Sequence, residues 1–237
     1  MIQCRHLLAV LGLAWASLMP AQADTRLADT LARAAPNLDR AVLAKALAAM
    51  DCAVGAGLPA APRLAVIDFS LPSSEPRLWI FDLARKALVL EELVAHGKNS
   101  GDNLATAFSN REGSHQSSIG LFRAAEAYVG RHGYSLRMDG LEPGINDRAR
   151  DRAIVIHGAD YVDPAWIERH GRIGRSQGCP AVRQAVAGKV VDSLKGGQFL
   201  FSYYPDRDWL RTSPYLNCQP ERVAAIVAPA RGQGDRG

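Results

Sequence analysis

The chain has 237 residues, a formal net charge of +4 and an isoelectric point near 9.0. Five of its 28 basic residues are lysines, so 23 are arginines; these are spread along the whole chain and no aromatic cluster lies beside a basic run, so we expect no nucleic-acid partner. The length suffices for one sizeable domain with a small appendage, and it excludes a miniprotein held only by disulfides.

The first 23 residues have the organisation of a secretory signal peptide. Arg5 precedes an uncharged apolar run from residue 7 to residue 19, and Ala-Gln-Ala at 21–23 is a small-x-small cleavage site. The run is too short for a permanent transmembrane helix, which needs about 20 apolar residues, and no later segment approaches that length. We therefore expect an exported protein of the periplasm or cell wall, with no integral membrane segment after cleavage. An uncleaved anchor is the alternative.

Three segments follow the predicted signal peptide. Residues 24–58 are rich in alanine, and apolar residues recur at three-to-four spacing from Val42 to Val54, with a start signal at Asp39 and a stop at Gly55. This pattern predicts an N-terminal helical segment. Residues 62–208 form the main domain, and residues 209–237 form a C-terminal extension.

The main domain has the pattern of a mostly β protein. Short runs rich in β-branched and aromatic residues occur at 64–70, 77–83, 87–97, 135–138, 153–157 and 199–204. One helix is predicted at 184–194, before two glycines. The polar residues 98–120 predict a long loop, and such loops in compact domains are commonly functional. Many short strands and few helices predict a mostly β sandwich or barrel with a small N-terminal helical segment.

The segment 154–183 carries the most chemical information. An apolar run ends at His157, and a glycine turn, Ser-Gln-Gly-Cys-Pro at 176–180, presents Cys179 22 residues later (179 − 157). A thiolate is a good nucleophile, and a nearby imidazole is the usual way to generate one. The pattern therefore predicts Cys179 as the nucleophile and His157 as the general base. His170, within the polar stretch 169–172 that reads as a loop, is the competing base.

The cysteine count supports a free thiol at position 179. Removal of the signal peptide removes Cys4 and leaves Cys52, Cys179 and Cys218. An odd number of cysteines in an oxidising compartment requires a reason. Because Cys52 and Cys218 lack catalytic surroundings, they are the predicted disulfide pair, and two buried free thiols are the alternative.

These residues resemble the YkuD-type L,D-transpeptidase catalytic domain, in its branch with a Ser-x-Gly-Cys-Pro turn. The family pattern is a histidine after an apolar strand and a Ser/Thr-x-Gly-Cys turn about twenty residues later. Blocks at 96–101, 113–118, 133–136 and 140–144 also resemble this branch, and the resemblance covers about residues 62–208. Two positions depart from the commonest pattern: Gln177 replaces a second histidine, and Ala181 replaces an arginine or asparagine.

The resemblance implies an exported cysteine acyltransferase that acts on peptidoglycan tetrapeptide stems through a Cys179 thioester. The stem is cut between a diamino acid and D-Ala. The acyl acceptor is an amine of another stem or, in an L,D-carboxypeptidase, water. A non-catalytic cell-wall-binding module is the alternative from another class. Backbone N–H groups of Gly178 and Cys179 are expected to hold the oxyanion, and the Gly158 carbonyl is the available partner to orient His157.

The predicted substrate contacts are His96, Gly158, Arg175, Ser176 and Gln177. For His96 the alternative is a structural role in its turn. Arg175 and Arg183 are candidates to clamp a stem carboxylate through bidentate hydrogen bonds, and the alternative is that they are ordinary surface arginines.

Two other kinds of site are disfavoured by the sequence. A metal site at His157, Asp160 and Cys179 lacks a fourth ligand with recognisable spacing, so we expect no metal and no cofactor. A papain-like protease has its cysteine near the mature N-terminus and its histidine far downstream. Here the histidine precedes the cysteine and the gap is short, which counts against that class.

Overall fold

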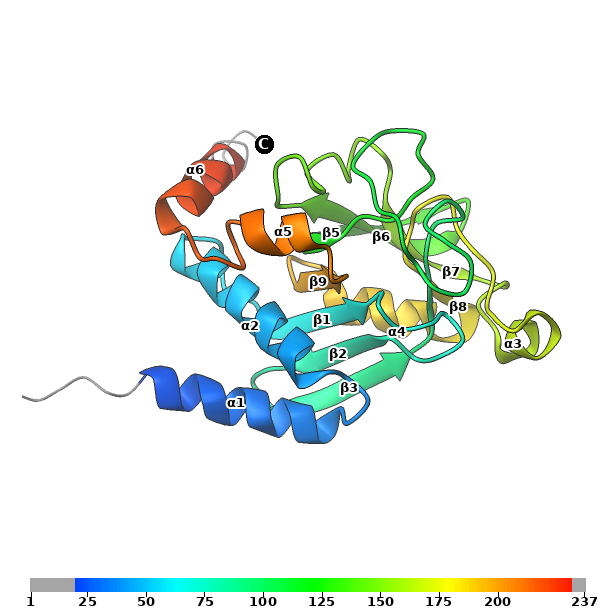
Figure 1. Cartoon of the computed structure of the whole chain (residues 1–237), viewed down its shortest axis with the longest axis horizontal. Helices are drawn as coiled ribbons and strands as arrows, with labels where there is room; N and C mark the ends of the chain where they lie inside the picture. Colours follow the sequence, from blue (N-terminus) through cyan, green and yellow to red (C-terminus); the bar gives the residue numbers. More distant parts are fainter. Residues whose placement is uncertain (1–19, 232–237) are drawn as a thin grey trace, which may run out of the picture.

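The computed structural model describes residues 20–231 (Figure 1). The signal peptide predicted over residues 1–23 lies mostly outside this range. Helix α1 (Pro20–Ala34) includes residues 20–23, so the predicted cleavage point falls within the first turns of this helix. Within the described range, no helix combines the length and apolar character needed to cross a membrane.

Residues 20–231 contain nine strands and six helices, joined by loops. The strands are β1 (Arg63–Asp68), β2 (Leu78–Asp82), β3 (Ala87–Glu92), β4 (Val94–Ala95), β5 (Gly120–Gly130), β6 (Gly133–Gly140), β7 (Val155–Ala159), β8 (Ala181–Arg183) and β9 (Phe199–Tyr203). Besides α1, the helices are α2 (Arg40–Gly55), α3 (Pro164–His170), α4 (Gln184–Leu194), α5 (Arg207–Thr212) and α6 (Pro220–Arg231).

The strands form one sheet in the order β3-β2-β1-β9-β5-β6-β7-β8-β4. The two outermost strands are consecutive in the chain, because β3 ends at Glu92 and β4 begins at Val94. The sheet is therefore a nearly closed barrel. Two pairs, β1 with β9 and β7 with β8, are parallel, and the other pairs are antiparallel. The predicted mostly β, barrel-like fold is confirmed.

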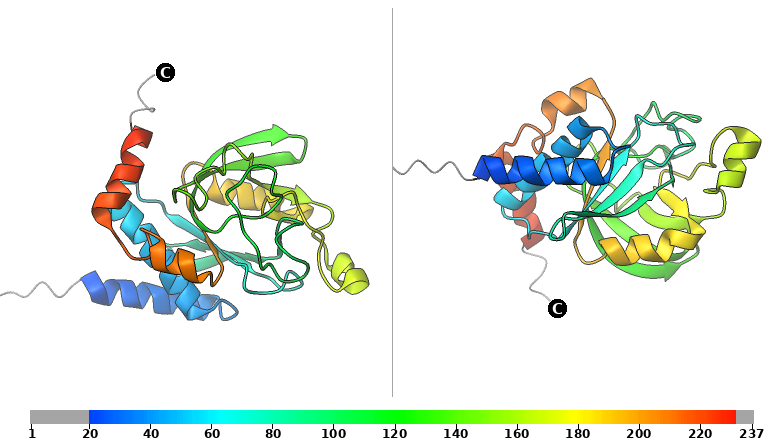
Figure 2. Two further views of the ribbon diagram at one scale, coloured as in Figure 1. Left: turned by 45° about the horizontal axis from the view of Figure 1, so that its top comes forward. Right: turned by 90° about the horizontal axis from the view of Figure 1, so that it is seen from below.

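Helices cover both faces of the sheet around β1, which explains why this strand is an uninterrupted apolar run. Leu64 and Val66 pack into a core cluster with residues of α1 and α2, whereas Ala65 and Ile67 pack into a second cluster with residues of α4. Because successive side chains point to opposite faces, this alternation places one helical layer on each side. Figure 2 shows α1 and α2 on one side of the strands and α4 on the other.

The N-terminal helices and the C-terminal segment belong to the same packed unit as the sheet. Helix α2 begins as predicted, because the Asp39 carboxylate accepts hydrogen bonds from two N–H groups of its first turn. The predicted disulfide between Cys52 and Cys218 is present, with Cα atoms 5.5 Å apart, and it joins α2 to the C-terminal segment. Trp209 and Tyr215 of that segment are buried in the cluster that contains α2.

Several elements differ from the sequence prediction: β5, β8, α5 and α6 were not predicted, and α3 replaces part of a predicted loop. Strand β5 follows the long loop directly, where no strand was predicted. Helix α3 occupies part of a predicted polar loop: the Asp163 side chain caps its first turn, and Gly171 ends it with a φ of 69°. The reading of residues 169–170 as loop is therefore wrong. Helix α4 has the bounds that were predicted for it.

Candidate active site

Strand β7 presents His157 on the face opposite the α4 core. Ile154 and Ile156 pack into the core cluster that contains α4, so the alternation of the strand turns Val155 and His157 to the other face. The register of β7 is fixed on both sides, since it pairs with β6 and, in parallel, with β8. Only 3% of His157 is exposed.

The His157 ring is oriented by a backbone carbonyl. Its Nδ1 lies 2.9 Å from the carbonyl oxygen of Gly158. A carbonyl can only accept, so Nδ1 carries the proton and Nε2 of the neutral ring keeps a free lone pair. Burial lowers the pKa of His157; the Gly158 carbonyl opposes this, and the nearby His132 and Arg131 lower the pKa further. His157 is therefore neutral at neutral pH, the state that a general base requires.

The turn at 176–180 is held by a serine at its start. The Ser176 hydroxyl accepts from the Gly178 N–H at 3.0 Å and donates to the Cys179 carbonyl at 2.6 Å. Gly178 has a φ of 125°, a conformation that L side chains rarely adopt. A Cβ there would also lie 2.9 Å from the carbonyl oxygen of Gln116. The glycine is thus required by both backbone conformation and space.

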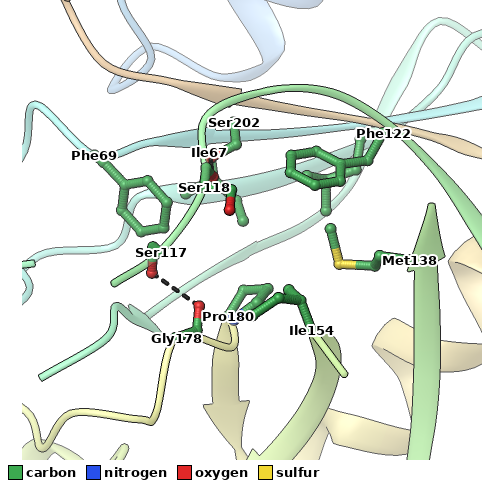
Figure 3. Close-up of a pocket in the computed structure, with 11 residues that line it drawn as sticks. Ile67, Phe69, Ser117, Ser118, Phe122, Met138, Ile154, Gly178, Pro180 and Ser202 are labelled. Atoms are coloured by element: carbon green, nitrogen blue, oxygen red, sulfur yellow. Dashed lines mark hydrogen bonds between the residues drawn. The ribbon is translucent and has the colours of Figure 1, made fainter. Parts of the chain in front are cut away.

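Residues of the long loop also form hydrogen bonds with this turn. Ser117 Oγ donates to the Gly178 carbonyl at 3.0 Å (Figure 3) and accepts from the Gly97 N–H at 3.0 Å. The Lys98 N–H donates to the Ser176 carbonyl at 2.8 Å. Figure 3 also shows the apolar interior behind the turn, where Pro180 lies beside Ile154. The loop therefore has a structural role in placing the cysteine.

Among the described residues, Cys179 is the single cysteine outside the disulfide. Its half-buried thiol lies against the start of β7: the Val155 N–H donates to Sγ at 3.5 Å, and Sγ donates to the Ala153 carbonyl at 3.7 Å. Burial raises the pKa of Cys179, while the Val155 N–H and the charges of Arg152 and Arg131 oppose that rise. The thiol is therefore protonated at neutral pH, so a base must remove its proton before or during attack.

Two arginines that were not predicted from the sequence, Arg152 and Arg131, act electrostatically on the thiol. Arg152 is held in place by the long loop, since it donates to the Ser118 hydroxyl and to the Gln116 carbonyl at 2.6 Å. Arg131 lies exposed in the turn between β5 and β6. Both line a hollow with Gly113, His115, Ile154 and Gln177. A second hollow is lined by Arg131, His132, Gly133, Gly158, Ala159, Asp160, Tyr161 and Gln184.

Several predicted contacts have structural partners instead. His96 is fully buried, and its Nδ1 accepts from Arg77 at 2.7 Å; its contact with substrate stays a prediction. Arg175 donates to the Gly101 carbonyl at 2.9 Å and pairs with Asp102 at 3.3 Å. These contacts hold Arg175 in the loop.

Arg183 also has a structural partner. It makes a bidentate pair with Glu92 at 2.8 and 2.6 Å, which joins the end of β8 to the end of β3 where the barrel closes. Of the predicted contacts, the exposed Gln177 and the Gly158 backbone line the two hollows. Ser176 is buried in the turn.

The geometry bears on three further predictions, which concern the oxyanion donors, the competing base and a metal site. The Gly178 N–H is used by Ser176, so of the two predicted oxyanion donors only the Cys179 N–H is left. His170 lies on the exposed helix α3 with its ring 5.0 Å from that of Trp166. Between residues 20 and 231, no group of three or more His, Cys, Asp or Glu side chains is arranged to hold a metal ion.

The chain matches the family model of the L,D-transpeptidase catalytic domain over residues 34–203. It belongs to this family. The predicted family is thus confirmed, while the branch with the Ser-x-Gly-Cys-Pro turn stays a prediction. A comparison with curated proteins gives no match.

Solved L,D-transpeptidases are distant from this chain. One from Mycobacterium smegmatis is 13% identical with a TM-score of 0.37, and the match covers 60% of this chain and 59% of that chain. One from Stackebrandtia nassauensis is 12% identical with a TM-score of 0.36, and the match covers 76% and 90% of the two chains. This chain therefore spans about three-fifths of the first relative's length.

Proposed function

We propose that this protein is an exported L,D-transpeptidase that forms a Cys179 thioester with peptidoglycan tetrapeptide stems. Family membership supports the reaction class. The observation that carries the assignment of residues is the free, half-buried thiol of Cys179, placed against the strand that presents a neutral His157. A thiol with a neutral imidazole as its base performs acyl transfer by nucleophilic catalysis.

In the acylation step, Cys179 Sγ attacks the amide carbonyl between the diamino acid and D-Ala. His157 Nε2 takes the thiol proton. Because burial raises the pKa of Cys179 and lowers that of His157, the proton moves during attack and not in a resting ion pair. The carbon–nitrogen bond then breaks, His157 returns the proton to the departing D-Ala amine, and the thioester remains. The Gly158 carbonyl stabilises the transient imidazolium through Nδ1.

The oxyanion of the tetrahedral intermediate is held by the Cys179 N–H. Loss of one such donor typically costs about 3 kcal/mol of transition-state stabilisation. Arg152 and Arg131 add a positive potential that favours both the thiolate and the oxyanion, since both already act on the Cys179 charge. The site thus compensates in part for the burial of its nucleophile.

The second hollow supports an amine as the acyl acceptor. Its lining includes Gly158, the residue after the proposed general base, and the acidic residue Asp160. A carboxylate attracts the ammonium group of an acceptor stem, whereas attack by water has no need of it. We therefore favour transpeptidation over L,D-carboxypeptidase activity.

The test is incubation with a disaccharide-tetrapeptide, with free D-Ala and product masses as readouts. We expect D-Ala release together with a cross-linked dimer; a tripeptide product alone would favour the carboxypeptidase. Cys179→Ser should abolish release, and His157→Ala should reduce it about 10²–10⁴-fold. His170→Ala is the matched control and should have no effect. Release of D-Ala by the Cys179→Ser protein would show that the nucleophile is wrongly assigned, and a folded protein without any release would favour a wall-binding module.

A further inference from the structure

The hairpin of β5 and β6 places a second histidine against the proposed general base. The rings of His132 and His157 are stacked, with centroids 4.3 Å apart and an interplanar angle of 22°. Gly130 and Gly133 are the last paired residues of the hairpin, so Arg131 and His132 form its two-residue tip.

The position of this tip is set by the sheet. Strand β6 pairs antiparallel with β7 through Leu136 and Ile156, so the start of β6, where the tip lies, is on the side of Ile156 toward His157. His132 itself is exposed, whereas His157 beneath it is buried. One face of the His157 ring is thus covered by a single side chain at the surface of the molecule.

Arg131 fixes the proton position on His132. The Arg131 Nε–H donates to His132 Nε2 at 3.1 Å. Because a guanidinium has no acceptor, Nε2 must accept, and in the neutral ring the proton is on Nδ1. Stacked on His157, this ring forms an aromatic pair that restricts the turning of the imidazole beneath it.

The charges that act on His157 come mainly from this tip. His132 and Arg131 both disfavour its protonated form, and on β7 itself the Gly158 carbonyl favours that form. From the cysteine turn, Cys179 contributes a neutral thiol, and Arg152 acts on that thiol. The hairpin tip is therefore the element whose removal would change the surroundings of His157 most.

We propose that His132 is a positioning residue: its ring, hydrogen-bonded to Arg131 and stacked on His157, holds the His157 imidazole in the orientation in which it takes the thiol proton during acylation. The inference rests on the proposed function for the identity of the reaction. Its effect on His157 can be measured without substrate, so the failure of one can be told from the failure of the other.

The experiment compares His132→Ala, which removes the stacked ring, with His132→Phe, which keeps a ring but cannot titrate. His170→Ala is the control, because His170 is also an exposed histidine beside an aromatic ring but lies on α3. The readouts are the NMR titration of the His157 ring in the substrate-free protein and the kcat for D-Ala release. Circular dichroism verifies that each variant is folded.

We expect both His132 variants to raise the pKa of His157, because a group that disfavours its charged form is lost. His132→Ala should lower kcat about 2- to 13-fold, which corresponds to the 0.5–1.5 kcal/mol of an aromatic pair at 1.36 kcal/mol per tenfold. His132→Phe should retain most of the rate. An unchanged His157 titration in both variants would overturn the proposal, as would an equal loss of kcat in Ala and Phe. If even the wild type releases no D-Ala, the titration alone decides.

Discussion

Replacement of Gly178 by alanine tests whether the turn is constrained as tightly as its contacts indicate. The φ of 125° at Gly178 would strain an alanine by about 1–3 kcal/mol. The added Cβ would lie 2.9 Å from the Gln116 carbonyl oxygen and 3.2 Å from Ile154 Cδ1. Since the first contact is with backbone, the loop or the turn must move, at a further cost of about 1–3 kcal/mol. We expect the free energy of unfolding to fall by about 2–6 kcal/mol.

The catalytic effect of Gly178→Ala should be larger than its effect on stability suggests. Cys179 is the next residue, and a misplacement of about 1 Å costs roughly 10²-fold in rate. We therefore expect D-Ala release to fall about 100-fold at a temperature where the variant is folded. Gly171→Ala is the matched control, because Gly171 has a φ of 69° and no atom within 4 Å of an added Cβ; it should lose only about 1–2 kcal/mol of stability and no activity. Equal urea-unfolding curves and equal rates for the two variants would refute the account of the turn.

Three other predictions follow from the buried groups and the disulfide. The rate of Cys179 alkylation by iodoacetamide should rise with pH through a midpoint above that of an ordinary cysteine, because burial raises the pKa of this thiol; a midpoint near neutrality would indicate a preformed ion pair. Glu142→Ala should lower the free energy of unfolding by about 2–6 kcal/mol, since it leaves two buried donors, the Leu121 N–H and Trp209 Nε1, without their acceptors at 2.8 and 2.9 Å; an unchanged urea midpoint would contradict this. Cys218→Ala should lower the free energy of unfolding by up to about 5 kcal/mol, and with it the melting temperature, because the disulfide joins residues 166 positions apart. An unchanged melting temperature would show that the bond does not constrain the unfolded chain.

The strands that could be predicted from the sequence are those buried on both faces. The first strand, β1, is continuous in apolar residues because helices cover both of its sides. Strand β5 lacks this signal for two physical reasons. Its outer half, which contains Glu126, is largely exposed, and an irregularity between Ala124 and Ala127 interrupts the alternation. No local pattern therefore marks it as a strand.

The same distinction applies to the site. His157 and Cys179 could be singled out because the chemistry of a strand-end histidine and a glycine turn is visible locally. Arg131 and His132 approach them only through the pairing of β6 with β7, which a sequence does not display, although two residues between Gly130 and Gly133 do suggest a hairpin tip.

The burial of His96 and the pairing of Arg183 depend equally on long-range contacts. Their partners are Arg77, which immediately precedes β2, and Glu92, which ends β3. The sequence alone does not show which of the predicted substrate contacts are buried, because their burial depends on how the barrel closes.

The central claim is that Cys179 carries the acyl group, and intact mass spectrometry tests it most directly. The protein is mixed with a tetrapeptide stem whose side-chain amine is blocked, quenched in acid within seconds, and weighed. We predict one adduct, equal to the mass of the donor minus that of D-Ala, which peptide mapping places on Cys179 and which the Cys179→Ser protein lacks. Release of D-Ala without any adduct on Cys179, or an adduct of the same mass on another residue, would contradict the account.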